Sequence, residues 1–211
     1  MKTWQKATIK ILSPHLEKQE PVHGKDHAVR VFKYCCLLAK DYKDVDIDAL
    51  FLASYLHDFG YFTKVKKHMK HAEFSVKFLD LLANKIKISP KKIALVRQII
   101  LNHPGKTVSG SNLPIEIYIF HDADKIEGLG AIGAMRLAGY AGQVGRKIWD
   151  PTKKRNSNLP YGGNFSAIHT ILDYQMKVTF YTKAGKKIAQ ERRRFSKLLV
   201  NEFLREYNFK S

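Results

Sequence analysis

The chain has 211 residues, of which 45% are hydrophobic and 11% aromatic, and it carries a formal net charge of +18. This length and apolar content suffice for one folded domain with a sizeable core, which excludes a mainly disordered chain. The sequence has no apolar run of about 18 residues, so we expect no membrane span. The N-terminal segment is basic and amphipathic, which is typical of a first helix rather than of a signal peptide.

Cysteine content and charge bear on location and partners. Cys35 and Cys36, the two cysteines, are adjacent and poorly placed to pair with each other, which predicts a reduced, cytoplasmic protein. The 37 Lys and Arg residues, against 19 Asp and Glu, either form a solvated surface or attract polyanions such as nucleotides, nucleic acid or acidic membranes. Charge alone does not choose between these interpretations. The sequence gives no indication of the oligomeric state.

Helical spacing dominates the first half of the chain. The expected helices are one that ends near Pro14, followed by residues 25–42, 47–59, 70–86 and 90–101. The segment 47–59 is apolar nearly all round, which is typical of a helix buried in the middle of a bundle, and Gly60 is a natural end for it. Ser89 and Pro90 are expected to open the last of these helices.

The second half is less regular. The isoleucines at 115, 117 and 119 alternate, which by pattern alone is typical of a strand, and the segment 126–140 holds four glycines and is a weak helix by propensity. Residues 142–164 are rich in Gly, Pro, Asn, Lys and Arg and predict a long loop. Helical spacing returns from Ala167 to about Tyr207, with a break near 182–185. We expect one all-α domain over residues 1–211, with residues 165–208 forming C-terminal helices packed on the bundle.

A His–Asp pair, His57 and Asp58, ends the most buried-looking helix. Burying an imidazole and a carboxylate is costly unless each has a partner. A divalent metal would satisfy both, and so would a simple His–Asp hydrogen bond at a helix end. The dipeptide alone leaves both interpretations open.

Two other segments carry similar side chains. His27 and Arg30 are three residues apart, so on a helix they share a face and can point into one site. Asp122 and Asp124 are two residues apart and, on a helix, point in different directions, so only one of them can be a straightforward ligand.

The order H…HD…D, with H-x-x-R-V around the first histidine, resembles the HD-domain superfamily of metal-dependent phosphohydrolases. The segment DADKIEGLGAIGAMR is similar to the DADRLEALGAIGxAR segment of one bacterial branch of uncharacterised or nucleotide-hydrolysing HD proteins. The tail, AIHTILDYQMKV followed by TKAGKKIAQERRRFSKLLVNEFL, also resembles the C-terminal helices of that branch. The resemblance covers roughly residues 20–207 and implies an all-α HD-domain helical bundle.

The resemblance implies a ligand set for one divalent metal, which could be Mn, Mg, Fe, Co, Ni or Zn. These ligands are His27, His57, Asp58 and Asp124. His23 matches a family histidine that lies near the site without being the usual ligand. His71 and His103 fall where some HD proteins hold a second metal or bind phosphate, although exposed or helix-end histidines are the alternative.

The positions of the neighbouring side chains relative to these ligands suggest their roles. Asp58 would also steer the attacking water, and Arg30 and Lys125 would stabilise the developing negative charge. Asp122 would hydrogen-bond to a neighbouring group, and Glu127 would orient a ligand or Lys125 from behind. Beyond these, four cations could close over a polyphosphate or be merely solvated: Arg136, Lys153, Lys154 and Arg155.

The leading functional hypothesis is hydrolysis of a phosphate ester or anhydride in a small-molecule substrate, with release of pyrophosphate from a nucleoside triphosphate as first choice. Simple phosphomonoesterase or cyclic-nucleotide activity comes second. A diiron oxygenase built on the same fold is an alternative of another class. A third class, a non-catalytic nucleic-acid-binding protein, is favoured by the charge of +18. A ligand set of four argues against this last class, because a binding module has no need of it.

Overall fold

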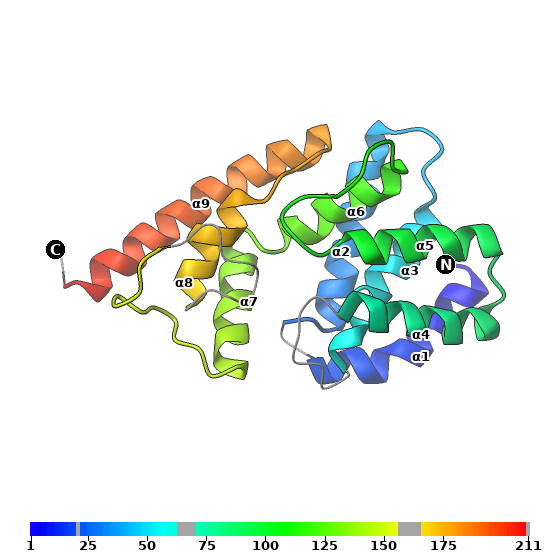
Figure 1. Ribbon diagram of the computed structural model, residues 1–211, viewed down its shortest axis with the longest axis horizontal. Helices are drawn as coiled ribbons and strands as arrows, with labels where there is room; N and C mark the ends of the chain where they lie inside the picture. The colour runs from blue at the N-terminus through cyan, green and yellow to red at the C-terminus, as the bar shows by residue number, and fades with distance from the viewer. Residues whose placement is uncertain (20–21, 63–70, 156–165, 210–211) are drawn as a thin grey trace.

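The computed structural model describes residues 1–19, 22–62, 71–155 and 166–209 (Figure 1). Within these ranges the chain is helical, and its extended segments pair only in an isolated bridge between Lys147 and Ser166. The helices are α1 Thr3–Leu16, α2 Lys25–Leu38, α3 Ile47–Leu56, α4 His71–Ile86, α5 Pro90–Asn102, α6 Ile115–Ile126, α7 Gly130–Gln143, α8 Ala167–His169 and α9 Lys183–Tyr207. The all-α expectation is confirmed.

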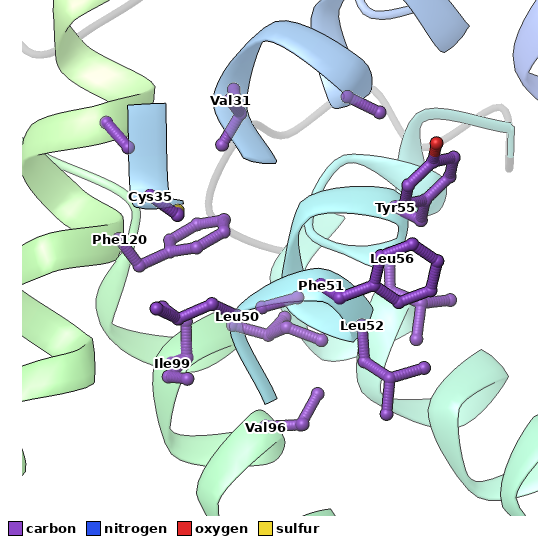
Figure 2. Packing of buried hydrophobic residues seen from close by; sticks show 14 of the residues in the cluster. Val31, Cys35, Leu50, Phe51, Leu52, Tyr55, Leu56, Val96, Ile99 and Phe120 are labelled. Carbon is purple, nitrogen blue, oxygen red and sulfur yellow. The ribbon is translucent and has the colours of Figure 1, made fainter. Parts of the chain in front are cut away.

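Helix α3 forms the centre of a bundle made by α1 to α6. All its residues from Ala49 to Leu56 are buried, as its uniformly apolar sequence predicts, and Figure 2 shows its leucines and Phe51 packed among side chains of the neighbouring helices. Asp46 caps the helix by accepting a hydrogen bond from the Ala49 amide at 2.9 Å. A fully buried leucine here, such as Leu56, contributes about 2–5 kcal/mol against alanine. The bundle therefore holds the end of α3 in a fixed position.

The end of α3 differs from the sequence expectation. The α-helix stops at Leu56 rather than at residue 59, and a 3₁₀ turn, Phe59–Phe62, follows the HD pair. Gly60 lies against the start of α4, where a Cβ atom would come within 2.0 Å of the His71 carbonyl oxygen. The Ser75 hydroxyl joins the two segments, since it accepts from the Gly60 amide and donates to the His57 carbonyl, both at 2.8 Å. The turn thus brings α4 directly against the HD pair.

The alternating isoleucines do not form a strand. They belong to α6, which contacts α2, α3, α5 and α9. Ile117, Ile119 and Phe120 are almost completely buried, because this helix is covered on several sides. A helix that is buried on several sides need not show a single apolar stripe, so the alternation of the isoleucines did not indicate a strand.

Two earlier boundaries also shift. α1 continues through Pro14 to Leu16, because a proline this near the C-terminal end removes only one hydrogen bond of the helix. α2 ends at Leu38, and a 3₁₀ turn, Ala39–Asp41, completes the segment expected as one helix. The remaining predicted helices of the bundle lie within about two residues of the observed ones.

The C-terminal helices form a second, smaller core. Its buried residues come from α7, α8, the π-helical turn Thr170–Tyr174 and α9, and they are Ala134, Leu137, Ala141, Ala167, Ile168, Ile171 and Val200. The glycine-rich α7 extends further than expected, to Gln143, and Gly133 is needed where a Cβ atom would lie 2.2 Å from the Gly128 carbonyl carbon. Of the expected loop, residues 156–164 lie outside the described ranges. No helix among the described residues combines the length and apolarity needed to cross a membrane.

Candidate metal centre

The HD pair lies where α3 ends inside the bundle. His57 is 1% exposed and Asp58 8% exposed, so both side chains are removed from solvent. The His57 Nδ1 atom lies 3.1 Å from the Ser54 carbonyl oxygen. Because a carbonyl only accepts, Nδ1 carries a proton and Nε2 faces the interior of the site. Burial lowers the pKa of His57, but the neighbouring Asp58 and Asp124 outweigh this effect and raise it above its ordinary value.

His27 on α2 and Asp124 on α6 meet the HD pair from two sides. The Nε2 atoms of His27 and His57 lie 3.2 Å apart. The Asp124 Oδ1 atom lies 3.5 Å from His27 Nε2 and 3.7 Å from His57 Nε2. The Asp58 Oδ2 atom lies 3.1 Å from His57 Nε2 and 3.6 Å from His27 Nε2. The four residues that the resemblance proposed as ligands therefore converge on one small volume.

A second cluster shares Asp58 with the first. The other carboxylate oxygen, Oδ1, lies 3.6 Å from His71 Nε2 and 3.6 Å from His103 Nε2. The two imidazole Nε2 atoms are 2.9 Å apart, and His103 Nδ1 lies 2.6 Å from the Ile100 carbonyl oxygen. Asp58 thus presents one carboxylate oxygen to each of two buried pairs of histidines. We call His27, His57, Asp58 and Asp124 the first cluster, and Asp58, His71 and His103 the second cluster.

The donors of both clusters fit divalent cations. Imidazole nitrogen and carboxylate oxygen are ordinary ligands of Mn, Fe, Co, Ni and Zn, and each cluster gathers three donor atoms within 4.8 Å of one another. Burial lowers the pKa of His103 to about 4, which keeps its imidazole neutral, as ligation requires. In each cluster two imidazole Nε2 atoms face each other at hydrogen-bond distance, and a cation between them would satisfy both lone pairs.

Both carboxylates remain ionised despite burial. Burial alone raises the pKa of Asp58, but the neighbouring His57 and His23 and a hydrogen bond with His103 hold it well below its usual range. Burial also raises the pKa of Asp124, and the adjacent Lys125 together with His27 outweighs that effect and lowers it. The site therefore holds two buried negative charges, which favours cation binding.

Glu127 and Arg30 support His27 from behind. Glu127 is fully buried and accepts a hydrogen bond from Arg30 Nε at 2.6 Å. The same carboxylate oxygen lies 3.6 Å from His27 Nδ1. Burial raises the pKa of Glu127, and the contacts with His27 and Arg30 more than reverse this shift. Glu127 therefore faces the side of His27 opposite to the first cluster.

Two cations expected near the substrate differ in their contacts. Lys125 Nζ donates to Asp124 Oδ2 at 2.8 Å, and its pKa is raised because the attraction of Asp124 outweighs the effect of burial. Arg136 donates to the Val22 carbonyl at 2.9 and 2.8 Å and to the Glu127 carbonyl at 3.1 Å. Its hydrogen bonds thus connect α7 to the segment before α2 and to the end of α6.

Asp122 points away from both clusters and holds the start of α9. Its carboxylate accepts hydrogen bonds from the Tyr181 amide at 3.0 Å, the Thr182 amide at 2.7 Å and the Thr182 hydroxyl at 2.7 Å. A Cβ atom at Gly185 would lie 2.4 Å from this carboxylate. The two aspartates of α6 therefore face opposite parts of the molecule, as their spacing predicts.

Sequence reasoning missed two tyrosines at the site. The Tyr61 ring lies between His23 and His71, stacked on them at centroid distances of 4.4 and 4.5 Å. Its position three residues after Asp58 could have drawn attention to it. Tyr174, in the π-helical turn, is buried and interacts electrostatically with Lys125 and Asp124. No local pattern identifies Tyr174, because only the fold brings its segment to α6.

The remaining expected residues take separate positions. His23 is half-buried, and the loss of solvation lowers its pKa to about 3, so it is neutral beside the first cluster. Arg155 Nε donates to the buried Asp173 carboxylate at 2.8 Å, which ties this part of the loop to the C-terminal helices. Lys153 and Lys154 lie exposed in the same segment.

The fold and the two clusters define an all-helical protein with a buried centre suited to divalent cations. The family model described as "HD domain" matches residues 24–129, half of the chain. The protein therefore belongs to the HD-domain family, whose members bind divalent metals. A search of curated proteins found no match.

Solved structures share this fold over nearly the whole chain. A protein from Lactobacillus plantarum has a TM-score of 0.83 at 23% identity, over 100% of this chain and 99% of the other. An HD-superfamily hydrolase from Bacillus thuringiensis has a TM-score of 0.67 at 22% identity, over 97% and 96%. Bacillus subtilis YpgQ in complex with ADP has a TM-score of 0.71 at 18% identity, over 96% and 94%. The fold thus extends beyond the HD-domain match to include the C-terminal helices.

Proposed function

We propose that this protein is a metal-dependent phosphohydrolase that acts on a nucleotide and releases pyrophosphate from a nucleoside triphosphate. The observation that carries the proposal is the position of Asp58, whose two oxygens face two buried histidine clusters. The sequence resemblance to nucleotide-hydrolysing HD proteins supports the choice of substrate. So does the similarity to YpgQ, which is known in complex with ADP.

The two clusters would hold the metal. His27, His57, Asp58 and Asp124 would bind one divalent cation, and His71 and His103 with the second oxygen of Asp58 would bind another. When bound, the metal would polarise a phosphoryl oxygen and lower the pKa of water.

The chain's own groups would position and stabilise the reacting atoms. Asp58 would direct the attacking water through a hydrogen bond to its carboxylate. Lys125, held charged beside Asp124, provides a fixed positive charge for the phosphoryl oxygens, and no reorganisation is needed when their charge grows. Arg30 uses Nε for Glu127, and its guanidinium has further N–H donors for a phosphate.

Arg136 would act differently from the polyphosphate clamp expected from sequence. Its guanidinium is occupied by the carbonyls of Val22 and Glu127. We therefore assign it the positioning of the segment that carries His23 and of the end of α6. His23, neutral and stacked on Tyr61, would form part of the wall beside the first cluster.

The direct test is product analysis with the purified protein. It is supplied in turn with Mn, Mg, Co, Ni, Zn or Fe(II) and incubated with nucleoside triphosphates, nucleoside diphosphates, cyclic nucleotides and p-nitrophenyl phosphate, and pyrophosphate and orthophosphate are assayed separately. We expect nucleoside monophosphate and pyrophosphate in equal amounts from the triphosphates.

Other outcomes would replace the proposal. Orthophosphate released from p-nitrophenyl phosphate, with no hydrolysis of the nucleoside di- and triphosphates, would indicate a phosphomonoesterase. Turnover of cyclic nucleotides alone would indicate a phosphodiesterase. Dioxygen-dependent oxidation of iron without hydrolysis under any metal would indicate an oxygenase. His57→Ala serves as the inactive control, and His15→Ala, which changes an exposed histidine of α1, serves as the matched active one.

A further inference from the structure

Helix α9 carries a row of cations on its solvent face. Exposed side chains along its first fifteen residues include Lys183, Lys186, Lys187, Arg194 and Lys197. At about 100° per residue, these five project within an arc of about 100°. The three glutamates of α9 project outside this arc. We call the five residues the basic strip.

Some cations on the surface of the bundle are paired with acidic side chains. There, Lys92 pairs with two aspartates at 2.8 and 3.0 Å, and Arg97 pairs with Asp80 at 2.6 Å. Across the described part of the chain, none of the five strip residues makes an ion pair. The strip therefore concentrates positive charge that the protein itself leaves uncompensated.

Two further arginines of α9 lie outside the basic strip, and their hydrogen bonds attach the helix to the rest of the protein. Arg192 donates to the Ile126 carbonyl at 2.8 Å, and Arg193 donates to the Val178 carbonyl. Lys183 and Lys186 lie in the first turn of α9, which contains no acidic residue, although the helix dipole disfavours cations there. An anion bound along the strip would relieve this unfavourable placement.

The dimensions of the strip favour one class of polyanion. From Lys183 to Lys197 the helix rises about 21 Å, which corresponds to about six nucleotides of a strand and is too long for a single triphosphate. A membrane-bound helix would turn a large apolar face to the lipid, whereas the main apolar face of α9 packs against the rest of the protein. Figure 1 shows α9 running along the outer edge of the molecule, where a long partner can lie beside it.

We propose that the basic strip binds the phosphate backbone of a nucleic acid without reading its sequence. This proposal is independent of the hydrolytic function, because the strip residues make no contact with the two clusters. It also assigns part of the net charge of +18 to a defined surface.

The test measures binding of labelled single-stranded RNA, single-stranded DNA and duplex DNA by fluorescence anisotropy, with potassium chloride varied from about 50 to 200 mM. The triple variant Lys187→Gln, Arg194→Gln, Lys197→Gln removes three charges from the strip. The matched control Lys6→Gln, Lys85→Gln, Lys91→Gln removes three exposed charges from the bundle. Circular dichroism melting verifies that both variants fold, and nucleotide turnover should be unchanged in both.

We expect wild-type affinity to fall steeply with salt, and the strip variant to lose about 2–3 units of the slope of log K against log salt and at least about tenfold in affinity at low salt. The control should bind within about twofold of wild type. Equal losses in both variants would overturn the proposal, because net charge alone would then explain binding. Absence of wild-type binding to all three nucleic acids at low salt would also overturn it.

Discussion

The two cores of the protein differ in what they enclose. The core of the bundle, built on α2, α3 and α6, surrounds the first cluster and Glu127. The core of α7, α8 and α9 is smaller, and among the described residues the groups that could hold a cation lie outside it. Yet the C-terminal helices contact the C-terminal half of α6, where Asp122 accepts from the Thr182 amide and Arg136 donates to the Glu127 carbonyl. The bundle would provide the metal ligands, and the C-terminal helices hold α6, which carries Asp122 and Asp124, in position.

The largest expected effect is the loss of metal and activity when His57, a histidine of the bundle, is replaced. His57→Ala removes an Nε2 donor from the first cluster and leaves the buried Asp58 without its nearest partner. We expect loss of bound metal and a fall in kcat of more than about 100-fold, beyond the 10–100-fold typical of an outer partner. Metal analysis and steady-state kinetics measure this, with His15→Ala as control. Full metal content in the variant would contradict the assignment.

The two aspartates of α6 allow metal binding by Asp124 to be tested separately from the attachment of α9 by Asp122. Asp124→Asn should weaken metal binding and abolish turnover, because an amide is a much poorer ligand than a carboxylate. Asp122→Asn should keep most of the metal and lower the free energy of unfolding by about 1–3 kcal/mol, since its N–H group would face the amides that now donate to it. Metal content, turnover and urea denaturation of both variants decide the matter. The reverse pattern would show that the assignment is displaced by two residues.

Substitution of Arg136 tests how much the contact between the bundle and the C-terminal helices contributes to stability. Arg136→Met leaves the Val22 and Glu127 carbonyls without these donors and should lower stability by about 1–3 kcal/mol. The exposed pair of Arg97 provides a matched control, and Arg97→Met should cost no more than about 1 kcal/mol. Urea denaturation compares the two. A direct role for Arg136 in substrate binding would instead raise KM at unchanged stability.

The smallest effect concerns acid stability. His121 is fully buried on α6, and burial lowers its pKa below the ordinary value of 6.5. The unfolded chain therefore binds this proton more readily than the folded one, so stability is lost as the pH falls below about 6.5, by no more than about 1.4 kcal/mol per pH unit. His121→Leu should reduce this dependence in metal-free protein denatured at pH 7.5 and at pH 5.5. An unchanged dependence would exclude His121 as a source.

The sequence predicted features that depend on one segment of the chain, and it did not predict features that depend on contacts between distant segments. The helix around His27 and Arg30 follows from apolar residues three and four apart, and the opposed directions of Asp122 and Asp124 follow from helical geometry. The alternating isoleucines misled because α6 is covered on nearly every side, which a pattern of one chain segment cannot reveal. For Arg136 the sequence left open a polyphosphate or solvent as its partner. Its hydrogen bonds to backbone carbonyls 9 and 114 residues away could not be predicted, because backbone groups leave no trace in sequence.

Gly60 sets the spacing between the two clusters. The segment after Asp58 approaches the start of α4 so closely that a Cβ atom would overlap the His71 carbonyl. Any larger residue at position 60 would therefore move His71 away from Asp58. The Asp58 carboxylate would then no longer lie close to the histidines of both clusters. The distance between Asp58 and the second cluster therefore depends on the absence of a side chain at Gly60, and not on any group that takes part in the chemistry.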